Sequence, residues 1–296
     1  MTSIVQHPVR KAILPVAGLG TRLLPITKTV AKEMLPLVDR PVIHFIVQEA
    51  IQAGIEEIAL VTARGKSSIE DFFDNHTHLQ QLLNQQGKHQ QANQLYNMKQ
   101  HVSLCSIRQP LPAGLGHALL CARRFAGNEP FAVLLGDVLV RPQNKNQDNA
   151  TKQLVDAFCR TGVPQVGLVH VPKEQMQHYG VVLGQKEQTG AFVINQTVEK
   201  PSPESVPLSP VILGRYLFSP DIWPFLQKQS PGTSGEIQLT DALNAFAQQH
   251  ALQGCFIEGD PVDTGNPLGY VQAMVLEALD RPQLRQQLLP WLKELT

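Results

Sequence analysis

The sequence predicts an α/β protein with three layers, α/β/α, around a central sheet that is mixed but mainly parallel. Two observations favour this class. In the first half of the chain, short apolar runs alternate with amphipathic stretches, a pattern typical of βαβ units whose sheet is covered on both faces. In the second half, four strand-like runs follow one another with few helical patterns between them, which predicts a mixed or antiparallel extension of the sheet.

Local signals predict the elements of the first half. Residues 41–53 have Pro41 at the first turn and Gly54 as a stop, which predicts a helix. The insertion 75–100 is polar, with Gln at eight positions and a weak helical spacing of Leu, so we expect a solvated helical hairpin. The other patterns predict strands at 11–17, 58–62, 102–108 and 131–135, and helices at 67–73 and 116–124.

The second half is expected to continue the same domain. Its Pro- and Ser-rich stretch 201–210 has ten residues, which makes a loop rather than a domain linker. We therefore predict a single domain over residues 1–296. Pro290 should kink the last helix or end it early. The patterns predict strands at 164–171, 180–183, 193–198 and 212–218, and helices at 239–249, 267–279 and 284–295.

Composition excludes several classes of protein. The 296 residues contain 25 Lys plus Arg and 25 Asp plus Glu, so the formal net charge is zero and the basic surface of a duplex nucleic-acid binder is not expected. No apolar stretch is long enough for a membrane span, and Met1–Arg10 has no apolar signal region. The four Cys are widely spaced without a Cys-x-x-Cys pair. We expect a cytoplasmic protein without disulfides.

Polar residues follow three of the predicted strands. Gly18–Arg22 follow the first strand, Gln109 and then Gly114–His117 follow the third, and Gly136 and Asp137 follow the fourth. The C-terminal ends of parallel strands face one crevice, where open α/β sheets bind ligands. The sequence therefore predicts a Rossmann-like sheet with a ligand site at this edge.

The glycine-rich segment 18–22 suits a phosphate group. Glycines after a strand let backbone N–H groups approach a phosphate, and Arg22 and Lys32 add positive charge. Two common phosphate loops are excluded: Leu23 stands where the dinucleotide fingerprint needs its third glycine, and no Gly-Lys-Ser/Thr sequence is present. A phosphate-rich ligand is expected, held by a backbone cradle and by cations.

Taken together, the motifs resemble those of the sugar-1-phosphate nucleotidylyltransferase family, and most closely its bacterial members that act on UTP and glucose-1-phosphate. The resemblance runs from about Lys11 to about Met274. It is carried by the joint order of the segments 14–22 (LPVAGLGTR), 32–38 (KEMLPLV), 114–118 (GLGHA), 179–182 (YGVV), 198–201 (VEKP), 214–216 (GRY), 235–241 (GEIQLTD) and 263–266 (DTGN).

The resemblance implies transfer of a nucleotidyl group without a general base. A phosphate oxygen of glucose-1-phosphate, already an anion, would attack the α-phosphorus of UTP in line, and pyrophosphate would leave. Catalysis then depends on alignment and charge neutralisation. The resemblance also implies a nucleotide-binding half at about 10–140, a sugar-phosphate-binding half at about 160–275 and a C-terminal helix at 280–296.

Four catalytic residues are implied by the resemblance: Arg22, Lys32, Asp137 and Lys200. Arg22 and Lys32 would neutralise the triphosphate and the departing pyrophosphate, and Lys200 would bind the sugar phosphate. Asp137 and Asp263 would hold Mg²⁺, a hard cation that takes one or two carboxylates plus phosphate oxygens.

The resemblance also implies contacts to the base and the sugar. Gln109 and Gly114 would read the base, because a Gln amide supplies both an acceptor and a donor to match uracil. Gly180 would leave room for the hexose ring, and Glu199 would accept hydrogen bonds from its hydroxyls. The nucleotide-binding set is Ala17, Gly18, Gly20, Thr21, Arg22, Glu33, Gln109 and Gly114, and the sugar-phosphate-binding set is Gly180, Glu199 and Lys200.

Two alternative functions stay open. The segments Gln109–Pro112 and Val262–Gly265 look more like the thymidylyltransferases of the same family, so dTTP is an alternative to UTP. A non-catalytic paralogue that binds a nucleotide sugar and regulates a partner is the other, although the intact sequence Gly20-Thr21-Arg22 favours an active enzyme. Relatives form dimers or tetramers, so we expect a homo-oligomer, with the C-terminal helices as its contact.

Overall fold

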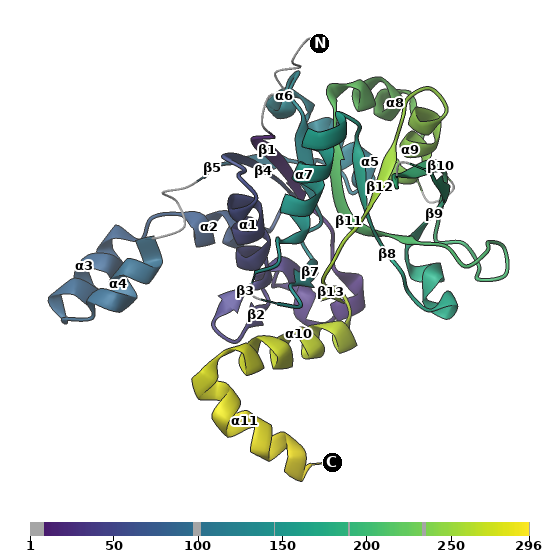
Figure 1. The fold of residues 1–296 in the computed structure, drawn as a ribbon. Helices are drawn as coiled ribbons and strands as arrows, with labels where there is room; N and C mark the ends of the chain where they lie inside the picture. Colours follow the sequence, from purple (N-terminus) through teal and green to yellow (C-terminus); the bar gives the residue numbers. More distant parts are fainter. Residues whose placement is uncertain (1–8, 97–101, 145, 189, 233–234, 296) are drawn as a thin grey trace.

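Figure 1 shows the fold as a central sheet with helices packed against it on both sides. The structure is a computed structural model that describes residues 9–96, 102–144, 146–188, 190–232 and 235–295. Within these residues, no helix is both long and apolar enough to cross a membrane.

The central sheet has nine strands in the described residues, in the order β5-β4-β1-β6-β11-β8-β12-β10-β9. Strands β5, β4, β1 and β6 pair in parallel, β11 joins β6 in antiparallel orientation, and β10 pairs antiparallel with β9 and β12. The strands are β1 (Lys11–Pro15), β4 (Glu57–Thr62), β5 (Ser103–Arg108), β6 (Phe131–Leu134), β8 (Gln165–Val169), β9 (Gly180–Lys186), β10 (Phe192–Glu199), β11 (Val211–Phe218) and β12 (Gln253–Phe256).

The expectation of a mixed sheet is confirmed, but the sheet is mainly parallel only in its N-terminal half. Beyond β6, strands β9, β10 and β11 are joined by loops too short for the crossover that a parallel pair needs. Within the described residues of this half, β8 and β12 are the one parallel pair. The prediction of a mixed or antiparallel extension of the sheet in the second half is therefore confirmed.

Helices cover both faces of the sheet and form two buried apolar clusters. On β1, Ile13 belongs to one cluster and Leu14 to the other, because successive strand residues point to opposite faces. One face is covered by α5 (Leu115–Cys121), α6 (Arg123–Ala126), α8 (Trp223–Lys228) and α9 (Leu239–Ala247), and the other by α1 (Val42–Gln52), α2 (Ser67–Phe73) and α7 (Ala150–Thr161). Each aliphatic side chain buried in this way stabilises the fold by roughly 1.5–3 kcal/mol.

Two helical segments project from this body. The hairpin of α3 (Thr77–Gln85) and α4 (His89–Tyr96) extends beside α2, which confirms the predicted helical hairpin, while 97–101 lie outside the described residues. At the other end, α10 (Pro267–Asp280) and α11 (Pro282–Glu294) form the C-terminus. Pro290 does not end its helix early, because α11 continues to Glu294. The alternative, a kink at Pro290, stays a prediction.

A short ribbon below the sheet connects distant parts of the chain. Strands β7 (Val138–Arg141) and β13 (Asp260–Asp263) pair antiparallel, with Asp263 opposite Val138. The ribbon therefore brings the residues after β6 next to those before α10. The remaining elements are a hairpin of β2 (Pro36–Leu37) and β3 (Arg40–Pro41) and 3₁₀ turns at Thr21–Leu23, Ile26–Lys28, Lys32–Met34, Lys173–His178 and Pro220–Ile222.

Candidate active site

A cavity of about 550 Å³ lies at the C-terminal ends of β1 and β6, where the sequence predicted a ligand site. Every predicted site residue except Glu33 lines this cavity. They are Ala17, Gly18, Gly20, Thr21, Arg22, Lys32, Gln109, Gly114, Asp137, Gly180, Glu199, Lys200 and Asp263. The fold thus brings together residues from both halves of the chain.

The loop after β1 adopts a conformation that requires glycine. Gly20 has φ 68°, in the left-handed region that L side chains rarely adopt. Its carbonyl accepts a hydrogen bond of 2.9 Å from the Thr27 hydroxyl, which fixes the loop. A 3₁₀ turn starts at Thr21 and places Arg22 at the cavity wall. This backbone leaves the loop open toward the cavity, as a phosphate cradle requires.

Two cation–carboxylate pairs line the cavity beside this loop. Lys32 Nζ is paired with Asp137 Oδ2, and Arg22 Nη1 lies 3.2 Å from Asp263 Oδ2. The side chain of Lys32 is 17% exposed and that of Asp137 is 15% exposed, whereas Arg22 is 58% exposed. The first pair is therefore largely shielded from water, and the second is open to it.

Burial and charge act in opposite directions on the pair of Lys32 and Asp137. Burial lowers the pKa of Lys32, but the carboxylates of Asp137 and Glu33 outweigh it and the pKa lies above its ordinary value. Burial raises the pKa of Asp137, but the Lys32 ammonium outweighs it and the pKa lies below its ordinary value. Both residues are therefore charged at neutral pH, as a site for phosphate and a cation needs.

Asp137 and Asp263 converge on Gly265. A Cβ at Gly265 would lie 2.6 Å from Asp137 Oδ2 and 2.9 Å from Asp263 Oδ1. Thr264 donates to the Asp137 carbonyl from both its backbone N–H and its hydroxyl, each over 2.8 Å. The two carboxylates are therefore held around one small space that only a glycine leaves open.

This donor set fits a hard divalent cation such as Mg²⁺. In the described part of the chain, no group of three or more His, Cys, Asp or Glu side chains is arranged to hold a metal. Two carboxylates that leave most positions to water and phosphate oxygens are the arrangement Mg²⁺ takes with nucleotides. The paired Lys32 and Arg22 would have to share their carboxylates with such an ion.

Glu33 lies behind the site rather than in it. Its side chain is fully buried, and its Oε2 accepts a hydrogen bond of 2.8 Å from Lys66 Nζ, which also donates to the Val16 carbonyl. Burial raises the pKa of Glu33 and lowers that of Lys66, each against the attraction of its partner. The structure therefore places Glu33 behind the residues that line the cavity.

Gln109 presents a fixed amide edge to the cavity. Its Nε2 donates to the Gly114 carbonyl over 3.1 Å and lies 2.9 Å from His117 Nδ1. Because a carbonyl accepts only from the amide nitrogen, the Gly114 contact sets which way the amide faces. Among the residues that the structure describes, none donates to the oxygen of Gln109, so this oxygen can accept a hydrogen bond from a ligand.

The C-terminal half provides the opposite wall. Glu199 Oε2 accepts a hydrogen bond of 3.3 Å from the Thr240 hydroxyl, and Glu199 Oε1 lies 3.4 Å from Lys200 Nζ. Lys200 has φ 42°, a left-handed backbone that is costly for a residue with a Cβ, and its N–H bonds the Tyr179 carbonyl. Strain of this kind gathers at functional sites, which agrees with a role for Lys200.

Sequence reasoning missed several residues that line the cavity. They are Tyr179, Glu236, Gln238 and Thr240, none of which is among the predicted site residues. Gln238 Nε2 donates to Glu236 Oε2 over 3.0 Å. The available signal was their position in the segments 179–182 and 235–241 that carry the family resemblance.

Comparison with known proteins defines the class to which the fold and the site belong. Residues 11–278 match the family model described as "Nucleotidyl transferase". The chain belongs to this nucleotidyl transferase family.

Individual members of the family whose names state an activity match almost the whole chain. The chain is 43% identical over 281 residues to the UTP–glucose-1-phosphate uridylyltransferase of Streptococcus pyogenes, covering 95% of this chain and 92% of the relative. A solved structure described as UDP-glucose pyrophosphorylase from Acinetobacter baumannii is 37% identical, with a TM-score of 0.88 over 97% of this chain and 100% of that chain. A structure described as UTP-bound UGPase from the same organism is 36% identical, with a TM-score of 0.88 and the same coverage.

Proposed function

We propose that the chain is a UTP–glucose-1-phosphate uridylyltransferase that forms UDP-glucose and pyrophosphate. The observation that carries the proposal is one cavity lined by the glycine loop, the two carboxylates that meet at Gly265, the Gln109 edge and the Glu199–Lys200 wall. Relatives that cover almost the whole chain bear this activity in their names, and one is described as UTP-bound.

The residues that line the cavity align the sugar phosphate and the α-phosphate of UTP, so that pyrophosphate is displaced in line. An anionic oxygen of the sugar phosphate forms a bond to the α-phosphorus of UTP as the bond to the pyrophosphate oxygen breaks. No side chain has to remove a proton. Lys200 holds the sugar phosphate, Arg22 and Lys32 neutralise the triphosphate, and the backbone at Gly18 and Gly20 cradles it. Asp137 and Asp263 would hold Mg²⁺, which when bound supplies charge neutralisation to the phosphate oxygens.

Gln109 selects the base in this proposal. Its free Oε1 accepts the imide N–H that uracil carries and that cytosine lacks. His117 is a positioning residue, because its Nδ1 contact and the Gly114 carbonyl together fix the Gln109 amide. Thymine carries the same imide edge, so Gln109 alone does not distinguish UTP from dTTP.

The relatives favour UTP over the two alternatives. A glucose-1-phosphate thymidylyltransferase structure from Bacillus anthracis is 23% identical with a TM-score of 0.71, which establishes a shared fold alone. The complete cavity, with its cradle and both carboxylates, favours an enzyme over a regulatory paralogue.

The proposal extends to the organisation of the protein. We take the helices on both faces of the sheet as a Rossmann-like three-layer arrangement, with the nucleotide bound by about 10–140 and the sugar phosphate by about 160–275. Exposed apolar side chains on α10 and α11, among them Leu268, Val271 and Trp291, suit a homo-oligomer contact, as a dimer or tetramer. The substrates are two small molecules, UTP and glucose-1-phosphate, and we expect the protein itself to be cytoplasmic.

A matrix of nucleotides and sugar phosphates tests the proposal. Pyrophosphate release is measured for UTP, dTTP, CTP and ATP, each with glucose-1-phosphate or galactose-1-phosphate and Mg²⁺. The expected result is the highest kcat/KM with UTP and glucose-1-phosphate. A higher kcat/KM with dTTP than with UTP would identify the protein as a thymidylyltransferase. No turnover with any pair of substrates would favour the non-catalytic regulatory paralogue.

A further inference from the structure

The strand β11 contains an arginine in the protein core. Arg215 is completely buried, and it is the largest of the fully buried side chains in the described residues. Its Nε donates to Glu49 Oε1 over 2.9 Å, and its Nη2 donates to Glu49 Oε2 over 2.8 Å, so the pair is bidentate. A buried guanidinium is costly unless its donors are satisfied, and Arg215 has further acceptors.

These acceptors are two backbone carbonyls on either side of Asp137. Arg215 Nη2 donates to the Val138 carbonyl over 2.7 Å, and Nη1 donates to the Leu135 carbonyl over 3.4 Å. The adjacent Gly214 carbonyl also accepts from the Leu135 N–H over 3.0 Å. β11 therefore holds the segment 135–138 at both ends, with the carboxylate of Asp137 between them.

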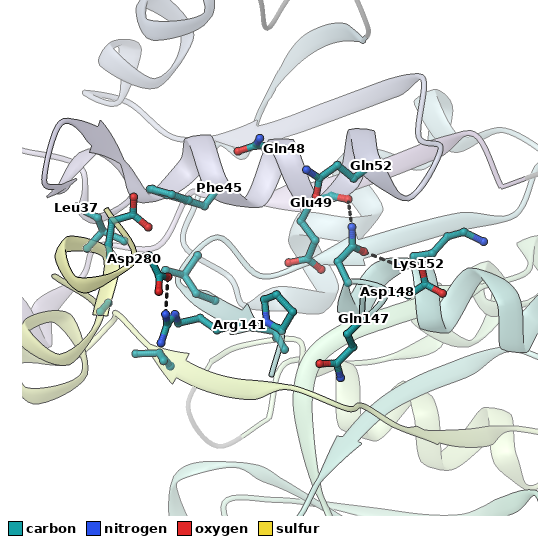
Figure 2. Close-up of a pocket in the computed structure, with 17 residues that line it drawn as sticks. Leu37, Phe45, Gln48, Glu49, Gln52, Arg141, Gln147, Asp148, Lys152 and Asp280 are labelled. Carbon is teal, nitrogen blue, oxygen red and sulfur yellow. Dashed lines mark hydrogen bonds and ion pairs between the residues drawn. The ribbon is translucent and has the colours of Figure 1, made fainter. Parts of the chain in front are cut away.

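Glu49 on α1 is fixed in turn by α7. Thr151 donates to Glu49 Oε1 from its N–H over 3.1 Å and from its hydroxyl over 2.6 Å. Burial raises the pKa of Glu49, but Arg215 and Thr151 outweigh it, so that the pKa lies below its ordinary value and the carboxylate stays ionised. Figure 2 shows Glu49 at a cavity of about 520 Å³, which is lined by α1, β7, α7 and α10 and is separate from the candidate active site.

Stability alone does not require this pair. Replacing a buried ion pair by apolar side chains of similar volume is often neutral or stabilising, so a purely structural role could be filled by an apolar pair. Two apolar side chains could not donate to the Leu135 and Val138 carbonyls. The distinctive contribution of Arg215 is therefore to the backbone that carries Asp137.

We propose that Arg215 is a positioning residue for the carboxylate of Asp137, and that Glu49 holds Arg215 in place for this task. This inference rests on the proposed function in one respect, because it assumes that Asp137 acts on the cation and the phosphates. Thr264 fixes the Asp137 carbonyl, and Arg215 fixes the Leu135 and Val138 carbonyls on either side of Asp137.

The test replaces the pair by apolar residues and reads the loop directly. The double variant Arg215→Met with Glu49→Leu is compared with the wild type and with Arg10→Met with Glu56→Leu, which removes an exposed ion pair. Four quantities are measured: Tm, hydrogen–deuterium exchange of peptides covering 135–141 and 57–62, Mn²⁺ binding in the presence of UTP, and kcat and KM.

The double variant is expected to fold with a Tm close to that of the wild type. Its 135–141 peptide should exchange about 10-fold faster while 57–62 is unchanged, Mn²⁺ should bind more weakly, and kcat should fall by about 10- to 100-fold with little change in the KM for UTP, because small displacements of a reacting group cost this much. The control pair should match the wild type. A folded double variant with wild-type exchange at 135–141 would overturn the proposal.

Glu49→Gln keeps the test decisive if the double variant does not fold. It preserves the shape of the side chain and one acceptor but removes the charge that holds Arg215. Faster exchange confined to 135–141 supports positioning, and unchanged exchange there contradicts it. If the wild type turns over no nucleotide, the proposed function fails, whereas the exchange measurement still decides the role of Arg215.

Discussion

Asp137 combines a buried position with a full negative charge. Its carboxylate faces Lys32, its carbonyl accepts twice from Thr264, and its pKa lies below the ordinary value. These contacts leave the side chain ordered before any ligand arrives. Such preorganisation is what an electrostatic mechanism needs, because the site then does not have to rearrange as charge develops.

Asp137→Asn tests the charge while it keeps the shape. We expect kcat to fall by about 10²-fold or more, since one group aimed at the reacting phosphates is lost, and we expect the dependence on Mg²⁺ concentration to move to higher values. Steady-state pyrophosphate release at several Mg²⁺ concentrations measures both. The matched control is Asp156→Asn, which removes the carboxylate of the partly exposed pair with Lys152. Wild-type activity in Asp137→Asn would mean that Asp137 has only a structural role in the turn after β6.

Gly265→Ala tests the space between the two carboxylates. The added methyl carbon would lie 2.6 Å from Asp137 Oδ2 and 2.8 Å from Arg22 Nη2, closer than such atoms approach. We expect kcat to fall by about 10²-fold, as for other small displacements at a reacting centre, with a smaller effect on Tm. Gly232→Ala is the control, because the nearest atom to its added carbon is 3.8 Å away. Equal activity of the two variants would contradict the convergence of the carboxylates on Gly265.

At the scale of the element, α1 contributes a histidine that resists protonation. His44 Nε2 is buried and has no hydrogen-bond partner among the described residues, and the ring packs edge-on against Phe45 and Phe72. Burial, with the nearby Arg40, lowers the pKa of His44 to about 4. The unfolded chain, with a pKa near 6.5, therefore binds a proton that the folded chain does not.

The consequence is a loss of stability in acid. As the pH falls from about 6.5 to about 4, His44 takes up a proton in the unfolded state but not in the folded state. The free energy of unfolding therefore decreases over this range. His44→Phe should remove this contribution, so the decrease in Tm between pH 7.5 and pH 5.0 should be smaller than in the wild type. His78→Phe, on the exposed hairpin helix α3, serves as the control. An unchanged pH dependence in His44→Phe would be inconsistent with a buried neutral ring.

The strands made of apolar runs were predictable, whereas one capped helix and the strands that pair across a long stretch of chain were not. β1, β4 and β6 are apolar runs that any neighbour in a sheet would bury, and the structure has them where the pattern placed them. Helix α7 was missed although Asn149 caps it and Gly162 ends it. The ribbon of β7 and β13 was missed because each strand has four residues and its partner lies far away along the chain.

The site followed the same rule. The glycine loop and the carboxylates stand at strand ends, so the edge of the sheet could be located from the sequence. The burial of Glu33 could not, because it depends on Lys66, which arrives from another element. Arg215 belonged to a recognised segment, but only the fold shows that its guanidinium reaches the backbone on both sides of Asp137.

For the whole molecule, the zero net charge conceals a concentrated charge pattern. Arg22, Lys32 and Lys200 surround the cavity with Asp137 and Asp263 among them. A ligand that binds only this folded arrangement must stabilise the protein. UTP with Mg²⁺ at about 100 times its Kd should add about 2.7 kcal/mol to the free energy of unfolding, seen as a rise in Tm by scanning calorimetry.

Removal of the cation or of Lys32 should reduce this rise. EDTA in excess should leave UTP a weaker stabiliser, and Lys32→Met should respond less than the wild type at the same UTP concentration. The exposed Lys28→Met, which lies outside the residues that line the cavity, is the matched variant and should keep the full rise. If UTP raised the Tm of Lys32→Met as much as that of the wild type, the triphosphate would not be bound by Lys32.

The pairing of β7 with β13, rather than the backbone between them, holds the two carboxylates of the site next to each other. Asp137 and Thr264 are 127 positions apart, yet their contact is set by a ladder in which Asp263 stands opposite Val138. A backbone cut in the loop 201–210 would leave every strand intact and put the two carboxylates on different fragments. The fragments should then reassemble into an active enzyme when expressed together, so that activity itself would report on their association.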